Sequence, residues 1–341
     1  MSMHWGIHNI SEMDSKWEGW DRLNGLYYCH HPYFDSRFIK PCVKYFGGNR
    51  IKLAQLKNDQ NETTGMILLE KKDLGSWALF SASQMQIIPI ILNPKNNGKE
   101  LKALFNALPG FCWRLQCLYQ DPLFTSLNLD QLGSSISRSY HCTTTSIELN
   151  QNFKLFWAQR KKSLQQNITR YLNRIEKENL KLLFIKLSQP DELKQGLSRY
   201  GLLESLGWKG TTGTAIHPDN SQGLFYNDVI QSFGLSGQAS IYELYLNGEL
   251  AASRLCINNN EMNIMLKTTY NEEMKQFSPG RILLYKMLEK EFEEMNCQKI
   301  EFYTNASKDQ IDWSSSTRDI YHFEIFRNRI FNELIQLKNR K

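Results

Sequence analysis

The chain has 341 residues, of which 41% are hydrophobic and 22% charged, and its formal net charge is +6. This length suits two domains of ordinary size, and the composition excludes a disordered or fibrous chain. No apolar run approaches the roughly 20 residues that cross a bilayer, and the first residues lack the basic and apolar regions of a secretory signal. We therefore expect a cytoplasmic protein with no transmembrane segment, for which peripheral contact with a membrane stays open.

Several common chemistries have no support in the sequence. The seven cysteines are scattered and form no CxxC pair, so neither a zinc ribbon nor a thioredoxin-like site is predicted. The patterns GxSxG, GxxxxGKS/T and HExxH are absent, which removes the hydrolase nucleophile elbow, the P-loop nucleotide hydrolases and the zinc proteases. We expect no metal site.

The first 140 residues predict strands separated by polar breaks. The candidate strands are residues 51–57, 65–70, 86–92 and 112–118, with a turn at residues 93–99. After Leu132, the polar sequence GSSISRS predicts a connection between two lobes. We place the boundary near residue 140, which gives an N-terminal domain of residues 1–140 and a C-terminal domain of residues 141–341.

The clearest helix is predicted over residues 152–179, where apolar residues at helical spacing mark one face and basic residues fill the other. Between residues 154 and 181 there are eight basic residues against two acidic ones, a net charge of +6. A basic face of this kind indicates either an anionic partner or a helix face that is simply exposed to solvent.

An antiparallel meander is predicted over residues 240–246, 250–257 and 262–268. Asn247-Gly248 is a strong hairpin signal, and a second tight turn follows at residues 258–260. A helix over residues 279–295 and a strand over residues 299–304 come next. Because the helix crosses over between strands 262–268 and 299–304, we expect those two strands to be parallel neighbours.

The start of that crossover helix predicts an anion site. Ser278 is a favourable N-cap, Pro279 suits the first helical position, and Gly280 has no side chain to obstruct a ligand. The N–H groups of the first turn and the positive end of the helix dipole favour a pyrophosphate there, and Arg281 adds positive charge. An ordinary capped helix is the alternative interpretation.

The order of meander, pyrophosphate-binding loop, helix and parallel strand resembles the core of the GNAT acyltransferases. The sequence is similar in particular to the CelD/BcsL-type acyltransferases, which are related to the FemABX peptidoglycan aminoacyltransferases. The matching segments are LESLGWKG at 203–210, TGTAI at 212–216, LKTTY at 266–270, SPG at 278–280, LL at 283–284 and EFY at 301–303. The resemblance is specific over about residues 150–315. It is weaker in the N-terminal lobe, where HPYF at 31–34 and GMILLE at 65–70 look like the family's degenerate first lobe.

This resemblance implies an α+β GNAT fold with two tandem GNAT-like lobes, whose sheets are mixed and mostly antiparallel. It also implies transfer of an acyl group, acetyl above all, from acyl-CoA to an amine. The implied acceptor is an amino sugar or a related precursor in cell-envelope polysaccharide biosynthesis. The expected partner is therefore a small or sugar-linked amine and no nucleic acid.

The resemblance also implies site residues. CoA is expected along the parallel strands and at the helix start, on Leu266, Lys267, Thr268, Ser278, Pro279, Gly280, Arg281 and Ile282. Backbone N–H groups near residues 266–268 would face the oxyanion. Glu204, expected to be exposed in a loop, is the candidate for orienting or deprotonating the amine. Tyr270 and Tyr303 are candidate acids, and Trp208 and Lys209 are candidate substrate-binding residues.

Two alternatives stay open. The first is an aminoacyl-tRNA-dependent transferase like the FemABX enzymes, in which the basic helix would contact the RNA backbone. No helical segment here is long enough for the tRNA-binding arm of that group, which favours CoA. The second is a lobe that binds a ligand without turnover. Asn271, which stands where the family usually has Asp, makes the second more credible and excludes a carboxylate role at this position.

Overall fold

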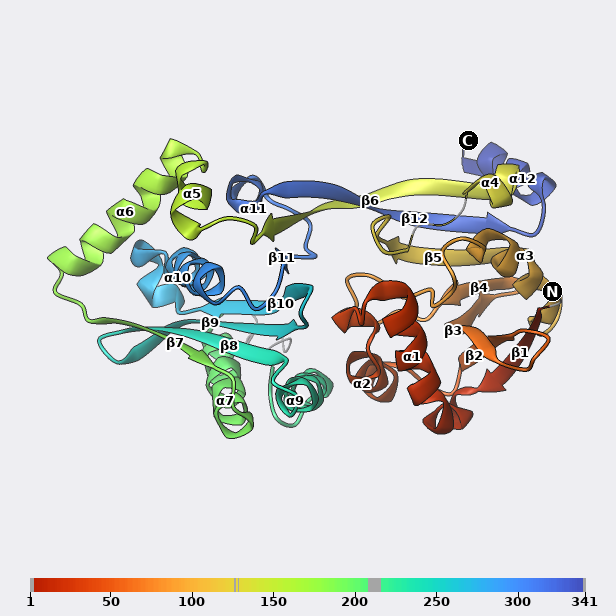
Figure 1. Ribbon diagram of the computed structural model, residues 1–341, viewed down its shortest axis with the longest axis horizontal. Helices are drawn as coiled ribbons and strands as arrows, with labels where there is room; N and C mark the ends of the chain where they lie inside the picture. Colours follow the sequence, from red (N-terminus) through yellow and green to blue (C-terminus); the bar gives the residue numbers. More distant parts are fainter. Residues whose placement is uncertain (1–2, 126, 128, 208–215, 340–341) are drawn as a thin grey trace. The chain divides into compact units, whose positions relative to one another are not determined.

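The computed structural model describes residues 3–125, 127, 129–207 and 216–339. The chain falls into two compact units, one formed by Met1–Thr143 with Arg318–Lys341 and the other by Thr144–Thr317. The predicted division near residue 140 differs in its last segment, because residues 318–341 pack with the first unit. Two strands, β6 (Ile136–Glu148) and β12 (Ser316–Phe326), carry the chain from one unit to the other (Figure 1).

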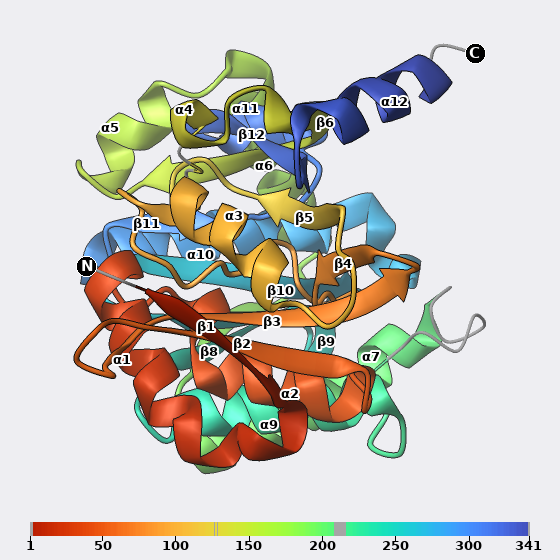
Figure 2. The same cartoon turned by 90° about the vertical axis from the view of Figure 1, so that its right-hand side faces the viewer.

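The first unit contains a mixed sheet in the order β1-β2-β3-β4-β5-β12. Strands β1 to β4 pair antiparallel, β4 and β5 run parallel, and β12 is antiparallel to β5. Figure 2 shows α1 and α2 side by side next to strands β1–β3. The elements besides β6 and β12 are β1 (His4–Asn9), α1 (Trp17–Tyr28), α2 (Ser36–Phe46), β2 (Ile51–Lys57), β3 (Thr63–Asp73), β4 (Ser76–Leu79), α3 (Asn97–Ala107), β5 (Arg114–Gln120), α4 (Leu129–Leu132) and α12 (Arg329–Asn339).

Several expectations for this unit were wrong. Helices α1, α2 and α3 lie where only strands and breaks were predicted. Residues 86–92 form no regular strand and make a single bridge, between Ile91 and Met66, since Pro89 lacks the N–H that a ladder needs. The sequence GSSISRS is not a linker, because its last four residues begin the 13-residue strand β6.

The second unit contains a mixed sheet in the order β6-β11-β10-β9-β8-β7. Strands β7 to β10 are antiparallel, β10 and β11 are parallel, and β6 is antiparallel to β11. The elements are α5 (Phe153–Ala158), α6 (Lys162–Lys177), β7 (Leu182–Leu187), α7 (Pro190–Leu206), α9 (Ser221–Gly234), β8 (Ala239–Leu246), β9 (Glu249–Asn258), β10 (Met262–Tyr270), α10 (Pro279–Glu294), β11 (Lys299–Glu301) and α11 (Lys308–Trp313).

The predicted meander and crossover are confirmed. Asn247 and Gly248 have φ values of 50° and 83°, the left-handed conformation that a two-residue hairpin requires. Helix α10 then joins the parallel strands β10 and β11, as predicted. It buries Ile282, Leu283 and Met287 in the core of this unit.

The helix predicted over residues 152–179 is two helices, α5 and α6, separated at residues 159–161. Side-chain contacts hold this break. The Arg160 guanidinium donates to the carbonyls of Trp313 and Ser314, and it lies 4.5 Å from the centre of the Phe156 ring. Arg160 is therefore part of the packing rather than of a solvated basic face.

The helices of this unit occupy two faces of its sheet. Figure 1 shows α6 and α10 on one face and α7 and α9 on the other. Alternate residues of β10 consequently point toward different helices. No helix of the described chain is long and apolar enough to cross a membrane.

Candidate functional site

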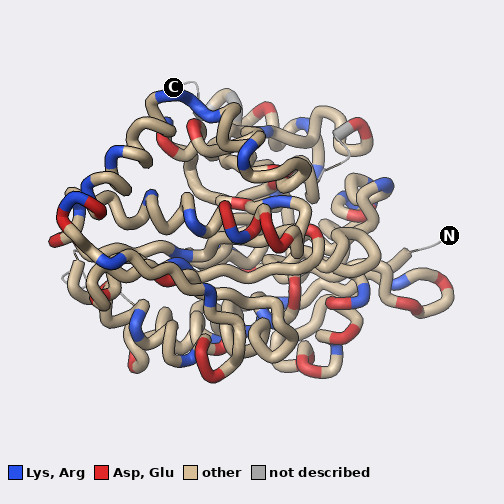
Figure 3. Tube along the Cα trace, turned by 60° about the vertical axis from the view of Figure 1, so that its left-hand side comes forward, with Lys and Arg blue, Asp and Glu red and all other residues tan. Residues whose placement is uncertain are grey.

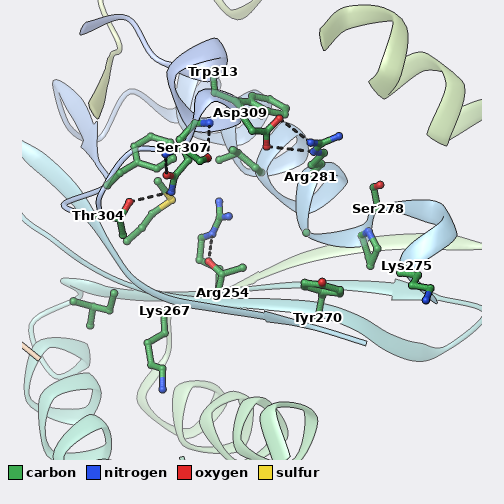
Figure 4. A pocket seen from close by; sticks show the side chains of 18 residues that line it. Arg254, Lys267, Tyr270, Lys275, Ser278, Arg281, Thr304, Ser307, Asp309 and Trp313 are labelled. Carbon is green, nitrogen blue, oxygen red and sulfur yellow. Dashed lines mark hydrogen bonds and ion pairs between the residues drawn. The ribbon is translucent and has the colours of Figure 1, made fainter. Parts of the chain in front are cut away.

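A cavity of about 620 Å³ opens in the second unit, where strands β10 and β11 part. The two strands are paired only from Met262 to Ile264 on β10, whereas β10 continues to Tyr270. Figure 4 shows side chains from β9, β10, α10 and α11 around this space. The lining residues are Arg254, Met265, Leu266, Lys267, Thr268, Tyr270, Lys275, Ser278, Pro279, Gly280, Arg281, Leu284, Phe302, Thr304, Ser307, Asp309, Gln310 and Trp313.

The wall formed by β10 carries a β-bulge at Leu266. Met265 pairs with Cys256 and Lys267 pairs with Leu255, so Leu266 has no partner residue on β9. The pairing of β10 with β11 has already ended at Ile264. The bulge therefore takes the backbone of Leu266 out of both ladders at the edge of the cavity.

The start of α10 forms the opposite end of the cavity wall. Pro279 is at the first helical position, and no acidic residue lies in the first turn. A Cβ atom added to Gly280 would meet only the Tyr270 ring, at 3.8 Å. The first turn is therefore open toward the cavity and has the electrostatic character of an anion site.

Ser278 occupies the N-cap position but does not cap the helix as expected. Its backbone is left-handed, with φ 49°, and its side chain makes no capping hydrogen bond. The Ser278 side chain, followed by Arg170 and Arg281, instead lowers the pKa of the Tyr171 phenol of α6. Tyr171 was not predicted from the sequence.

Besides Lys267, three cationic residues line the cavity. Arg281 forms an ion pair with Asp309 of α11, with Nη2 and Oδ1 2.9 Å apart, and donates to the Tyr171 hydroxyl at 3.2 Å. Lys275 is exposed at the rim. Arg254 of β9 is only 6% exposed and donates from Nε to Thr268 Oγ1 at 2.9 Å. Arg254 was not predicted from the sequence, although a lone arginine within the apolar run of β9 is a visible signal.

Lys267 and Glu204 lie on the other side of the sheet. Figure 4 shows the Lys267 side chain pointing away from the other labelled residues. Its amino group is 3.0 Å from Glu204 Oε1, and it also bonds to Gln222. Only the strand part of Lys267 can therefore contact a ligand in the cavity.

The expected exposed loop position of Glu204 was wrong. Glu204 is in helix α7 and is 2% exposed, because the helical phase turns it toward the sheet. Its Oε2 accepts the backbone N–H of Ile216 at 2.8 Å, and its Oε1 accepts the Tyr200 hydroxyl at 3.4 Å. The carboxylate thus holds α7, β10 and the residues before α9 together.

The remaining candidate residues are scattered. Tyr270 is half-exposed and lines the cavity at the Gly280 end. Tyr303 is buried, has φ 47°, and is absent from the lining, which contains its neighbours Phe302 and Thr304. Trp208 and Lys209 lie outside the described residues. Asn271 caps the turn after β10, where its Oδ1 accepts the Glu273 N–H at 2.9 Å.

Basic residues recur along α6 at positions 162, 170, 174 and 177 (Figure 3). Lys162 and Arg170 border a shallow polar groove together with Gln166 and Asn173. Arg174 is engaged, because it donates to the Gln276 carbonyl at 2.8 Å. Within the described ranges, no group of His, Cys, Asp and Glu side chains is arranged to hold a metal ion.

A known family model matches most of the second unit. Residues 160–310 match the family model of the acetyltransferase (GNAT) domain, a range that contains β10, the bulge and the start of α10. No curated protein matches the chain.

Solved structures share the whole fold. FemX is similar with a TM-score of 0.62 at 10% identity, over 94% of this chain and 98% of FemX. A tandem GNAT protein from the clavulanic acid biosynthesis pathway is similar with a TM-score of 0.51 at 11% identity, over 95% of this chain and 99% of that protein. These likenesses confirm the predicted α+β GNAT fold with mixed, mostly antiparallel sheets and tandem lobes. The CelD/BcsL assignment stays a prediction.

Proposed function

We propose that this chain, which is an acyltransferase carrying a GNAT acetyltransferase domain, transfers an acyl group from acyl-CoA to an amine. Acetyl-CoA is the donor we propose first. The proposed acceptor is an amino sugar or a related precursor of a cell-envelope polysaccharide. This acceptor class rests on the resemblance to the CelD/BcsL branch.

The observation that carries the proposal is one cavity that joins the β10 bulge to the start of α10. The first turn at Gly280, which has room for an added Cβ atom, is the proposed site of the CoA diphosphate. From Tyr270, beside Gly280, to Leu266 the strand spans about 13 Å, at roughly 3.3 Å per residue. An extended arm lying along β10 would therefore bring its thioester to the bulge.

The chemistry requires an amine to attack the thioester carbonyl carbon. A C–N bond forms and the C–S bond breaks, while the amine loses a proton and the departing thiolate gains one. The backbone N–H of Leu266 is the proposed donor to the developing oxyanion, because the bulge takes it out of both ladders. Preorganised donors of this type are worth about 10²–10³ in rate.

The proton path is proposed from the same geometry. Glu204 is already held by Lys267 and the Ile216 N–H. We propose that Glu204 holds β10 in position through Lys267, on the side of the sheet where the acceptor would bind. Water would take the amine proton. Tyr270 lies at the diphosphate end, about 13 Å along the strand from the bulge, so we assign it to donor binding rather than to protonation of the thiolate.

An aminoacyl-tRNA donor is the second candidate. The observation that favours it is the exposure of three basic residues on α6, Lys162, Arg170 and Lys177. A ligand-binding lobe without turnover is the third. Measurements of tRNA binding and of turnover with acetyl-CoA distinguish both alternatives from the CoA proposal.

The test is calorimetric titration of acetyl-CoA into the wild type and three variants at Gly280. Gly280→Glu places a negative charge where the diphosphate is proposed, so we expect affinity to fall about 10-fold or more. Gly280→Gln separates bulk from charge, and Gly280→Ala adds only a Cβ atom, which the space accepts.

The same variants control for folding. An acidic residue in the first turn of a helix is favourable for the helix, so the melting temperature of Gly280→Glu should not fall. Gly19→Glu, at an open position of α1, is the control for net charge. Unchanged acetyl-CoA affinity in Gly280→Glu, or no binding by the wild type, would refute the proposal.

A further inference from the structure

Arg254 is a charged side chain that is buried in the wall of the cavity. It is 6% exposed, and burial lowers the pKa of its guanidinium. Moving a guanidinium out of water is costly unless an anion and several hydrogen bonds replace its hydration. A buried arginine is therefore expected to have a carboxylate partner.

No such partner is present in the described part of the chain. The guanidinium makes two hydrogen bonds there, from Nε to Thr268 Oγ1 at 2.9 Å and from Nη1 to the sulfur of Met287 at 3.6 Å. A guanidinium has five N–H donors, so most of its capacity is unused. Asp309, the carboxylate that lines the same cavity, is bound to Arg281.

The position of Arg254 on β9, opposite β10, also bears on the ligand. Arg254 is paired with Thr268, midway between the bulge at Leu266 and Tyr270 beside Gly280. Each end is about 7 Å away along the strand. Figure 4 shows the side chain rising from the sheet into the space between these ends. The pantetheine arm of CoA is neutral at this level, so the arm alone does not supply the missing anion.

We propose that the ligand of this cavity places an anionic oxygen group, a carboxylate or a phosphate, against the guanidinium of Arg254. The carboxylate source is a dicarboxylic acyl group, such as a succinyl thioester, whose free end turns back toward Thr268. The phosphate source is the donor's own diphosphate. This inference extends the proposed function to the class of acyl donor.

The experiment titrates CoA, acetyl-CoA and succinyl-CoA into wild-type protein, Arg254→Met and Arg254→Gln. If the acyl carboxylate is the anion, the variants lose about 10- to 100-fold in affinity for succinyl-CoA alone. If the diphosphate is the anion, all three ligands weaken by that factor. If each of the three ligands binds both variants as tightly as it binds the wild type, the inference is overturned.

A separate measurement is independent of CoA. Inorganic phosphate should raise the melting temperature of the wild type, and this increase should be smaller in both Arg254 variants. If the wild type binds no CoA compound but keeps this phosphate effect, the proposed function fails and the Arg254 inference stands. An identical phosphate effect in wild type and variants, together with unchanged CoA affinities, refutes the inference while leaving the function intact.

Arg199 supplies the matched control. It is bonded in bidentate fashion to the buried carboxylate of Glu243, at 2.9 and 2.8 Å, outside the cavity. Arg199→Met leaves the Glu243 carboxylate without its arginine partner, so it should lower the melting temperature without affecting ligand affinity. Arg254→Met removes a buried charge that has no carboxylate, so the ligand-free protein should be at least as stable as the wild type. If Arg254→Met does not fold, Arg254→Gln, which can still bond to Thr268, decides the question.

Discussion

The carboxylate of Glu204 lies 3.0 Å from the amino group of Lys267, and this pair joins helix α7 to strand β10. The side chains are 1% and 14% exposed, so water screens the pair weakly. The pair lies on the face of the sheet opposite α10. The pair therefore holds β10 in position from the face of the sheet that does not line the cavity.

Replacing Glu204 with Gln should lower both stability and turnover. Lys267 would be left buried without the Glu204 carboxylate, which costs about 3 kcal/mol, or roughly 6–12 °C in melting temperature. An exposed general base, the role considered for Glu204 from the sequence, would instead affect turnover alone, by about 10²–10⁴-fold. Thermal unfolding measured beside turnover against pH separates the two roles.

A double-mutant cycle gives the control for this pair. Lys267→Met should also destabilise, and the double variant Glu204→Gln/Lys267→Met should lose less than the sum of the single losses. A wild-type melting temperature in Glu204→Gln combined with a 10²-fold loss of turnover would instead make Glu204 a general base.

Asp309→Asn should strengthen the binding of acetyl-CoA. Asp309 neutralises Arg281 at the helix start, with Nη2 and Oδ1 2.9 Å apart. Both side chains are partly exposed, so the gain should be modest, about 2- to 5-fold, and largest at low salt. Calorimetry at two salt concentrations measures it.

Asp312→Asn is the matched control for net charge. Asp312 is on the same helix α11, where it pairs with Lys161 instead of a cavity residue. It should leave acetyl-CoA affinity unchanged within about 2-fold. An equal gain in both variants would show that only the overall charge matters.

Local signals predicted the site's backbone well. The Asn247-Gly248 turn fixes the β8–β9 hairpin, and Pro279 with Gly280 marks the start of α10. These features depend on neighbouring residues, so a single sequence carries them. The GNAT fold followed from their order.

Side-chain partners over long separations were not predictable in the same way. The Glu204–Lys267 contact spans 63 positions, and nothing near Glu204 indicates that it is buried. The break between α5 and α6 likewise depends on Arg160 reaching carbonyls more than 150 residues away. Helix α2 was missed because Pro41 lies inside it, which argues locally against a helix.

The exposed basic residues of α6 provide a test of the tRNA alternative. The triple variant Lys162→Gln/Arg170→Gln/Lys177→Gln removes charge where these side chains are exposed. We expect acetyl-CoA affinity to change by less than about 2-fold and use of an anionic acceptor to fall several-fold. Filter binding of tRNA at increasing salt measures the alternative.

Arg160→Gln is the contrasting variant, because Arg160 holds the Trp313 and Ser314 carbonyls. It should destabilise the protein rather than alter anion binding. Tight, salt-dependent tRNA binding that the triple variant loses would favour the aminoacyl-tRNA donor.

A pH dependence of stability should arise in the first unit, at Glu100 of α3. Glu100 is buried, its Oε2 has no hydrogen-bond partner among the described residues, and desolvation raises its pKa from 4.5 to about 7. Folding therefore favours the protonated form. The associated stability is fully present below pH 4.5 and is lost as the pH rises through about 7.

Glu100→Gln keeps the shape without the charge, so its melting temperature should exceed that of the wild type by about 2–4 °C or more at pH 8 and by little at pH 5. Glu18→Gln, an exposed change in α1, should show no such divergence. Parallel melting curves for wild type and Glu100→Gln across this range would mean that Glu100 ionises in the folded protein as it does in water.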